Sequence, residues 1–313
     1  MASTYTSSPQ SDQLKSQLRL HLIVFIWGFT AILGDLITLQ AISLVFYRIG
    51  ISLLVLWPFV WIFRRGHSPP AKSRILLMLT GFLIALHWVT FFHAIKISNI
   101  SITLACLSSG SLFGALFEPI FFKRKLRLYE VVLGLVVIVG ISTIFAVETQ
   151  YAWGIATALT SASLSALFST INGLWVRNHK PTVISTYELT GGFLMLTVWL
   201  LIRGDLSVGQ AMSISSSDWG YLFVLGTICT AYPFIEAVRV MKHLNPFTVL
   251  LTINLEPVYG IVLAYLIFGE KEQMSPAFYF GTLLILCAVM ANGVIERYRR
   301  RAISRRKAQD SAT

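Results

Sequence analysis

Long apolar segments alternate with short polar connections along nearly the whole chain. A helix needs about 20 apolar residues to cross the core of a bilayer, and ten segments reach that length. The connections are short and often contain Gly or Pro, as in Gly66-His67-Ser68-Pro69-Pro70. The pattern therefore predicts an all-α integral membrane protein with ten transmembrane helices. Their expected bounds are 18–38, 41–63, 75–95, 98–121, 126–146, 152–176, 182–202, 219–241, 246–268 and 275–296.

The composition agrees with a chain that folds in lipid. Hydrophobic residues make up 55% of the 313 positions and charged residues only 12%, whereas soluble domains carry roughly 25% charged residues. This balance excludes a soluble enzyme, a disordered scaffold and a disulfide-stapled secreted module. The three cysteines all lie inside apolar segments, where we expect free thiols.

Positive charges are distributed unequally between the two sides of the predicted bundle. With the amino terminus inside, the outer loops hold only Lys96, Arg203 and Lys271, and almost all other Lys and Arg fall on the inner side. Cytoplasmic loops carry such an excess. We therefore expect both termini in the cytoplasm of a bacterial-type plasma (inner) membrane, with no cleaved secretory signal. The net charge of +11 then reflects topology and contact with lipid, and nucleic acid is not an expected partner.

The chain also repeats itself. A shift of 147 residues places 121–134 on 268–281, with Phe and Gly matching at the two ends. Because each half has five spans, an odd number, the halves must enter the membrane from opposite sides. Such inverted repeats recur in transporters that hold a substrate near mid-membrane. The expected organisation is a polar cytoplasmic tail, two five-helix repeats and a basic cytoplasmic tail, at residues 1–17, 18–147, 148–296 and 297–313.

One motif resembles a known family. The segment Asn254-Leu255-Glu256-Pro257-Val258-Tyr259-Gly260, followed by a Gly-Glu pair that ends at Glu270, resembles the helix-nine signature of EamA-type permeases in the drug/metabolite transporter superfamily. Trp27 and Arg48 also resemble common positions of that family. The resemblance implies a ten-helix transporter of small metabolites such as amino acids, drugs or nucleotide sugars.

Three charged residues inside predicted spans point to a solute site. An unpaired charge at the centre of a membrane helix costs at least ~2.5 kcal/mol, so Arg48, Glu188 and Glu256 need partners or water. At 1.5 Å per residue, Arg48 lies about 10 Å from the outer edge of its span and Glu188 about 9 Å from the inner edge of its own. We therefore expect these two at different heights, too far apart for a salt bridge.

Each of these charges allows a structural as well as a functional role. Arg48 either holds a substrate carboxylate or phosphate, which its planar fork suits, or it caps a helix or pairs with Asp35. Glu256 either binds a substrate amine or carries a coupling proton, or it joins helices as a neutral hydrogen-bonded group. Glu236 and Arg239, three residues apart, are expected to pair with each other.

Other positions are expected to shape the pathway. The residues expected to line it with aromatic or polar surface are Trp27, His87, Trp88, Tyr232, Asn254 and Tyr259. The expected hinge or gate positions are Gly110, Pro233, Pro257 and Glu270. Polar residues recur at helical spacing and predict inward faces, or tight helix packing, at Ser161, Ser165, Ser169 and Asn172 and at Gly226, Thr230 and Pro233.

These features favour a secondary transporter, an exporter of amino acids or related small metabolites that works by alternating access. The sequence has no Gly-x-x-x-x-Gly-Lys nucleotide loop, so the gradient of the solute or of protons must supply the energy. The alternatives are a passive channel or facilitator, a multidrug efflux protein and, more remotely, an intramembrane enzyme. The expected partners are a small organic solute, H+ as the alternative coupling ion, and membrane lipid. No metal or cofactor is expected, and the oligomeric state is open.

Overall fold

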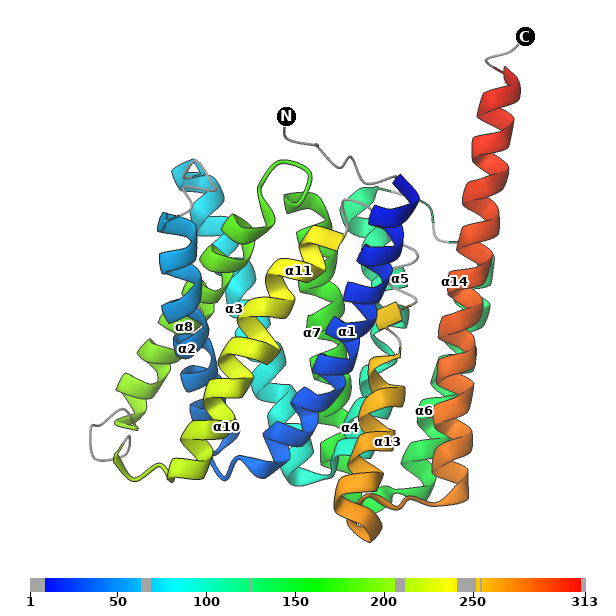
Figure 1. Cartoon of the computed structure of the whole chain (residues 1–313). Helices are drawn as coiled ribbons and strands as arrows, with labels where there is room; N and C mark the ends of the chain where they lie inside the picture. The colour runs from blue at the N-terminus through cyan, green and yellow to red at the C-terminus, as the bar shows by residue number, and fades with distance from the viewer. Residues whose placement is uncertain are drawn as a thin grey trace.

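Long helices that run up and down one bundle make up the described part of the chain (Figure 1). This computed structural model describes residues 9–62, 69–123, 125, 127–205, 212–240, 252–253 and 255–310. The helices of the first half are α1 (Pro9–Leu36), α2 (Ala41–Ile62), α3 (Ala71–Ile97), α4 (Ile100–Leu107), α5 (Gly110–Phe122) and α6 (Leu128–Val147). The helices of the second half are α7 (Ala152–Trp175), α8 (Pro181–Arg203), α10 (Ser216–Gly226), α11 (Tyr232–Val240), α13 (Glu256–Phe268) and α14 (Pro276–Asp310). Short helical turns lie at η1 (Thr149–Tyr151), η2 (Thr227–Ala231) and η3 (Gly269–Glu272).

Nine helical stretches among the described residues are long and apolar enough to cross a membrane. They correspond to the predicted spans one to eight and ten. The ninth predicted span, 246–268, is described only at 252–253 and from 255 onward, and α13 forms its lower part. Large apolar side chains such as Leu54, Trp61 and Leu266 lie exposed on the outside of the bundle, where lipid tails can cover them. The predicted fold class, an all-α membrane protein, is confirmed.

The two halves are related by inversion. In Figure 1, α1 runs from the upper to the lower end of the bundle, whereas α7 runs from the lower to the upper end. The packing is reciprocal: α3 packs against α7 and α8, and the equivalent span in the second half, formed by α10, η2 and α11, packs against α1 and α2. The pairs α6–α14 and α4–α13 join equivalent helices of the two halves. These contacts therefore join residues of one repeat to residues of the other.

The fourth predicted span is broken near its middle. Helix α4 ends at Leu107 and α5 begins at Gly110. The hydroxyls of Ser108 and Ser109 donate to the carbonyl oxygens of Leu104 and Cys106, at 3.2 and 2.6 Å. Serine hydroxyls that bond to main-chain carbonyls compete with the regular helical pattern. The sequence predicted one helix because two serines do not interrupt an otherwise apolar segment of this length.

Both expected tails contain helix. Helix α1 begins at Pro9, inside the tail predicted at 1–17, and α14 continues to Asp310, through most of the tail predicted at 297–313. Proline suits the first turn of a helix, where no N–H is needed. The end of α14 is rich in Arg, Ala, Lys and Gln, which are strong helix formers. Apolar segments therefore predict where a helix crosses lipid, and not where it ends.

Candidate functional site

Arg48 lies buried between the two halves, on α2, with 2% of its surface exposed. Its Nε donates a 2.7 Å hydrogen bond to the Thr230 hydroxyl in η2. Its guanidinium carbon lies 4.0 Å from the ring centroid of Trp88 and 5.4 Å from that of Phe92, both on α3. Its Nη1 is buried and has no hydrogen-bond partner among the described residues. Trp88 therefore holds the face of the guanidinium and Thr230 holds Nε, while Nη1 remains available to another acceptor.

A π-helical turn, η2, places Thr230 beside Arg48. Because a π turn shifts the helical hydrogen bonds by one residue, the Thr230 hydroxyl donates to the carbonyl of Leu225, five residues earlier, at 2.7 Å. Ser52 ties the two helices together, since its hydroxyl lies within hydrogen-bond distance of the carbonyls of Arg48 and Gly226. Gly226 is required here because a Cβ atom would lie 3.0 Å from the Arg48 carbonyl oxygen. The sequence pattern marked Thr230 and Gly226 as inward-facing, and did not predict the turn.

His87 lies on α3 next to Trp88 and is fixed by α7. Its Nδ1 lies 2.8 Å from the Ser161 hydroxyl and 2.9 Å from the Ser161 carbonyl oxygen. Its ring contacts that of Phe168, with 5.5 Å between the centroids. Trp88 packs edge-to-face on Phe234 of α11 at 5.5 Å. His87 is therefore fixed by hydrogen bonds to Ser161, and it lies at the level of Arg48; its expected role in lining the pathway stays a prediction.

A second polar group surrounds Glu188 on α8. Glu188 is 0% exposed, and its Oε2 accepts a 3.3 Å hydrogen bond from the Asn172 side chain on α7. Its Oε1 has no partner among the described residues, and neither do Asn172 Oδ1 and Trp175 Nε1. Gly81 of α3 permits the close contact here, because a Cβ atom at this position would collide with the Glu188 main chain. Of these residues, sequence reasoning missed Trp175, which continues the α7 stripe three residues beyond Asn172.

The spacing of contacts along α3 gives the difference in height between Arg48 and Glu188. Glu188 packs at Gly81 and Arg48 stacks over Trp88, seven residues further along the same helix. At 1.5 Å per residue these two points lie about 10 Å apart along the helix axis. Within the described chain, Arg48 and Glu188 form no ion pair with each other or with any other residue. The site is thus made of two separate charged groups joined by the α3–α7–α8 packing.

Glu256 begins α13 and is half-buried against α1. Gly28 allows this approach, because a Cβ atom there would lie 3.2 Å from the Glu256 carbonyl oxygen. The charge of Glu256 lies within electrostatic range of Arg48. Pro257 falls in the first turn of α13, where its missing N–H is tolerated. Most of the ninth predicted span before Glu256 lies outside the described residues, so the place of Pro257 within that span stays a prediction.

The remaining lining residues are placed unevenly. Tyr259 packs edge-to-face on Phe25, with 5.9 Å between ring centroids, and Trp27 is half-buried on α1. Tyr232 is 40% exposed, so it does not belong to the buried Arg48 group. Asn254 lies outside the described residues. The structure thus brings together Arg48, Trp88 and His87, with Glu256 nearby, and leaves Tyr232 aside.

Two expected hinge residues lie at helix interruptions. Gly110 begins α5 directly after the break at Ser108 and Ser109, and Pro233 lies in the first turn of α11 directly after η2. Interruptions of this kind are where a moving helix can absorb backbone rotation. Their role as hinges remains a prediction.

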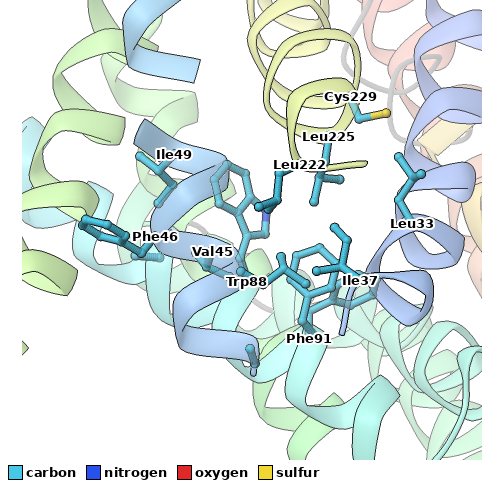
Figure 2. Close-up of a cluster of buried hydrophobic side chains, with 14 of the residues drawn as sticks. Leu33, Ile37, Val45, Phe46, Ile49, Trp88, Phe91, Leu222, Leu225 and Cys229 are labelled. Atoms are coloured by element: carbon cyan, nitrogen blue, oxygen red, sulfur yellow. The ribbon is translucent and has the colours of Figure 1, made fainter. Parts of the chain in front are cut away.

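A layer of buried apolar side chains lies toward the lower end of the bundle (Figure 2), and its α2 members Val45 and Phe46 precede Arg48 on that helix. Helices α1, α2, α3 and α10 all contribute to it. Its buried residues include Leu33, Ile37, Val45, Phe46, Phe91, Leu222 and Leu225. Because these side chains come from both halves and are almost fully buried, the candidate site has no open route to the lower surface through them.

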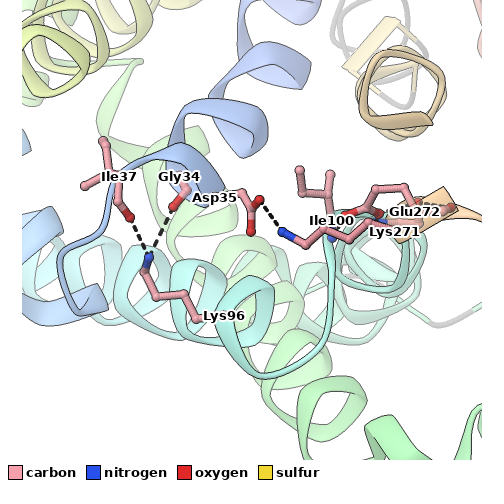
Figure 3. Close-up of polar contacts among 8 residues, drawn as sticks. Gly34, Asp35, Ile37, Lys96, Ile100, Lys271 and Glu272 are labelled. Carbon is pink, nitrogen blue, oxygen red and sulfur yellow. Dashed lines mark hydrogen bonds and ion pairs between the residues drawn. The ribbon is translucent and has the colours of Figure 1, made fainter. Parts of the chain in front are cut away.

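Polar contacts close the same end (Figure 3). Lys96 of α3 donates to the carbonyl of Ile37 at 2.7 Å, and Lys271 of η3 pairs with Asp35 of α1 at 2.7 Å. Asp218 of α10 accepts hydrogen bonds from the Thr38 amide and hydroxyl at 2.9 and 2.6 Å. These contacts attach the end of α1 to three other elements. They also show that Asp35 pairs with Lys271, and not with Arg48.

The carboxylate that caps a helix at this end is Glu272, two residues beyond the expected Glu270. Glu272 is 0% exposed and accepts from the amides of Ile100 and Ser101 at 3.1 and 2.9 Å, at the start of α4. Glu270 is exposed. The local sequence could not distinguish them, since the cap joins two segments that are 171 residues apart. The expected Glu236–Arg239 ion pair is present at the upper end of α11.

The sequence matches the profile of the EamA-like transporter family twice, over residues 16–146 and 152–293. The chain belongs to the EamA-like transporter family. The predicted resemblance to the drug/metabolite transporter superfamily is thereby confirmed. A solved structure described as "Crystal structure of protein" shares the fold with a TM-score of 0.61 and 16% sequence identity, over 89% of this chain and 95% of that chain. No curated protein matches the sequence. This EamA-like protein is therefore a membrane transporter of small solutes.

Proposed function

We propose that this protein is a secondary transporter that exports amino acids or related small metabolites from a bacterial-type cell. The solute binds midway through the membrane between the inverted halves, which expose the site to one side at a time. One observation carries the proposal. The buried Nη1 of Arg48 lacks a partner among the described residues, although Thr230 and Trp88 hold the rest of the guanidinium.

An anionic group is the ligand that suits this nitrogen. A guanidinium is permanently charged, and a buried donor without an acceptor is unfavourable. A solute carboxylate provides both the acceptor and the opposite charge. Trp88 belongs to the first half and Thr230 to the second. A solute at Arg48 therefore sits where a movement of the halves would change its surroundings.

The closed lower end supports a carrier over a passive pore. The apolar layer and the contacts of Lys96, Asp218, Lys271 and Glu272 lie between Arg48 and the lower surface. A solute at the site can leave on that side only after elements of both halves separate. A passive channel needs a continuous open path, which this packing does not provide.

The charge distribution supports the orientation in the membrane that we propose. Most Lys and Arg lie at the end where α1 begins and α14 ends, which is the pattern of a cytoplasmic side. The lower end then faces outward, and the structure is closed to the outside. Solute or proton gradients supply the energy in this proposal.

Exchange in reconstituted vesicles tests the function. Purified protein is inserted into liposomes, and uptake of labelled amino acids is measured with and without unlabelled amino acid inside. We expect saturable uptake that internal solute accelerates, and its loss in Arg48→Gln. Arg203→Gln serves as the matched control, because Arg203 is exposed and pairs only with the exposed Asp205 in the described chain. Linear uptake that is equal in all three proteins would contradict a carrier.

A further inference from the structure

Four buried side-chain atoms in the described part of the chain have no hydrogen-bond partner, and three of them belong to one residue of α8 and two residues of α7. They are Glu188 Oε1, Asn172 Oδ1 and Trp175 Nε1, and the fourth is Arg48 Nη1. Buried polar groups are almost always paired in native proteins, so a group of unpaired ones requires an explanation. Arg48 Nη1 belongs to the anion site described above. Of the other three residues, Glu188 packs at Gly81, about 10 Å from Trp88 along α3, and Asn172 is hydrogen-bonded to Glu188.

The three residues share one face of the bundle. Ser161, Phe168, Asn172 and Trp175 follow one another on α7 at spacings of seven, four and three residues, which keeps them on one side of the helix. Ser161 and Phe168 contact His87 of α3, and Asn172 contacts Glu188 of α8. Trp175, the last residue of α7, therefore continues the stripe that faces α3 and α8.

The carboxyl group of Glu188 has no cationic partner among the described residues. Glu188 forms no ion pair with any residue that the structure describes, and its hydrogen bond comes from the neutral amide of Asn172. Glu256 differs, because the positive charge of Arg48 lies within range of it. A buried carboxylate without a cation is unfavourable. A ligand with a positive charge and N–H donors satisfies both Glu188 Oε1 and Asn172 Oδ1.

Trp175 adds a second requirement. An indole N–H can only donate, so it needs an acceptor, which an ammonium group does not offer. A ligand that satisfies all three atoms carries an ammonium group and, close to it, an acceptor oxygen. Amino alcohols and α-amino acids have this arrangement, with two carbons between the nitrogen and the oxygen.

We infer that Glu188, Asn172 and Trp175 form a binding site for a protonated primary amine with an acceptor oxygen two carbons away. The site deepens the transport function proposed above, on which its biological role rests. It assigns recognition of the amine to Glu188, and adds Asn172 and Trp175 to the solute-binding residues. Arg48 and Glu188 then bind opposite charges at two heights in the same bundle.

A pair of isosteric ligands tests the site by binding alone. The affinity of the purified full-length protein in detergent micelles is measured by calorimetry for ethanolamine and for propylammonium, which lacks the oxygen. We expect ethanolamine to bind roughly threefold to tenfold more tightly, the contribution of one hydrogen bond. In Trp175→Phe, which keeps an aromatic ring and loses the N–H, the two ligands should bind equally.

Two further variants complete the test. Glu188→Gln should weaken both ligands about tenfold or more, because it removes the charge. Trp199→Phe is the matched control, since Trp199 is exposed on α8, and it should preserve the preference for ethanolamine. If Glu188→Gln does not fold, the comparison of Trp175→Phe with Trp199→Phe decides.

The outcomes separate this site from the transport proposal. Equal binding of the two amines to the unaltered protein, an unchanged preference in Trp175→Phe, or no binding of either amine would overturn the site, and water alone would then fill the group. Amine binding without solute exchange in vesicles would contradict the transport proposal and leave the site standing. Exchange without amine binding would contradict the site alone.

Discussion

The guanidinium of Arg48 lies over the ring of Trp88, with 4.0 Å between the guanidinium carbon and the ring centroid. Arg48 comes from α2 and Trp88 from α3, and Thr230 of the other half holds Nε. Stacking fixes the plane of the fork, and the hydrogen bond fixes its rotation. The unpaired Nη1 is therefore presented in one orientation, which is the condition for a selective anion site.

Replacement of Trp88 by leucine should weaken the binding of anionic solutes. The ring orients the guanidinium, and because a desolvated cation–π contact contributes about 2 kcal/mol, roughly 30-fold in affinity is the upper limit of the effect. The half-saturating concentration for exchange in vesicles measures the effect. Trp61→Leu is the matched control, because Trp61 is exposed on the lipid side of α2 and its loss should leave that concentration unchanged. An equal effect of both substitutions would show that Trp88 acts only through general stability.

Thr230→Val should destabilise the protein as well as impair exchange. Valine keeps the shape but removes the acceptor of Arg48 Nε, and an unsatisfied buried donor costs about 1–3 kcal/mol. We expect a lower midpoint of thermal unfolding in detergent. Thr230→Ser retains the hydroxyl and should remain close to the unaltered protein. If the valine and serine variants unfold at the same temperature, the Arg48–Thr230 hydrogen bond does not contribute to stability.

Glu272 and Glu270 offer a direct comparison at the lower end. Glu272→Gln removes the charge that caps the start of α4. We expect the free energy of unfolding to fall by about 1–2 kcal/mol, because hydrogen bonds to a charged group are stronger than those between neutral groups. Glu270→Gln changes an exposed side chain on the same short turn and should have no measurable effect. The midpoint of thermal unfolding is measured for both variants. A larger loss of stability in Glu270→Gln than in Glu272→Gln would contradict the assignment of the cap.

The sequence predicted the large features of this fold because lipid imposes a strong and simple constraint. Apolar segments gave the spans, and the odd number of spans per repeat gave the inversion. The break at Ser108 and Ser109 and the π turn at Thr230 were not predictable, because both involve hydroxyls that bond to particular main-chain carbonyls.

The site shows the same division between local and long-range information. Charges inside spans drew attention to Arg48 and Glu188, and their distances from the edges of their spans predicted different heights. Sequence could not indicate that Asn172 would reach Glu188, or that Glu272 would cap a helix far away in the chain. Those contacts depend on how α7, α8 and η3 pack, which no local pattern specifies.

Motion at the lower end is the central requirement of a carrier, and a reversible cross-link tests it. Cysteines replace Asp35 and Lys271, whose side chains meet at 2.7 Å across the two halves, in a protein that carries Cys287→Ser. The native Cys106 and Cys229 are buried and remain. A reducible bis-methanethiosulfonate reagent then bridges the new cysteines, and single-cysteine variants receive the same treatment as controls.

The rate of amino acid exchange in vesicles, before cross-linking, after it and after reduction, is the most direct measurement. We expect exchange by the double variant to fall to the level of protein-free vesicles when cross-linked and to recover on reduction, while the single-cysteine variants exchange throughout. Undiminished exchange by the fully cross-linked protein would contradict alternating access through the lower end.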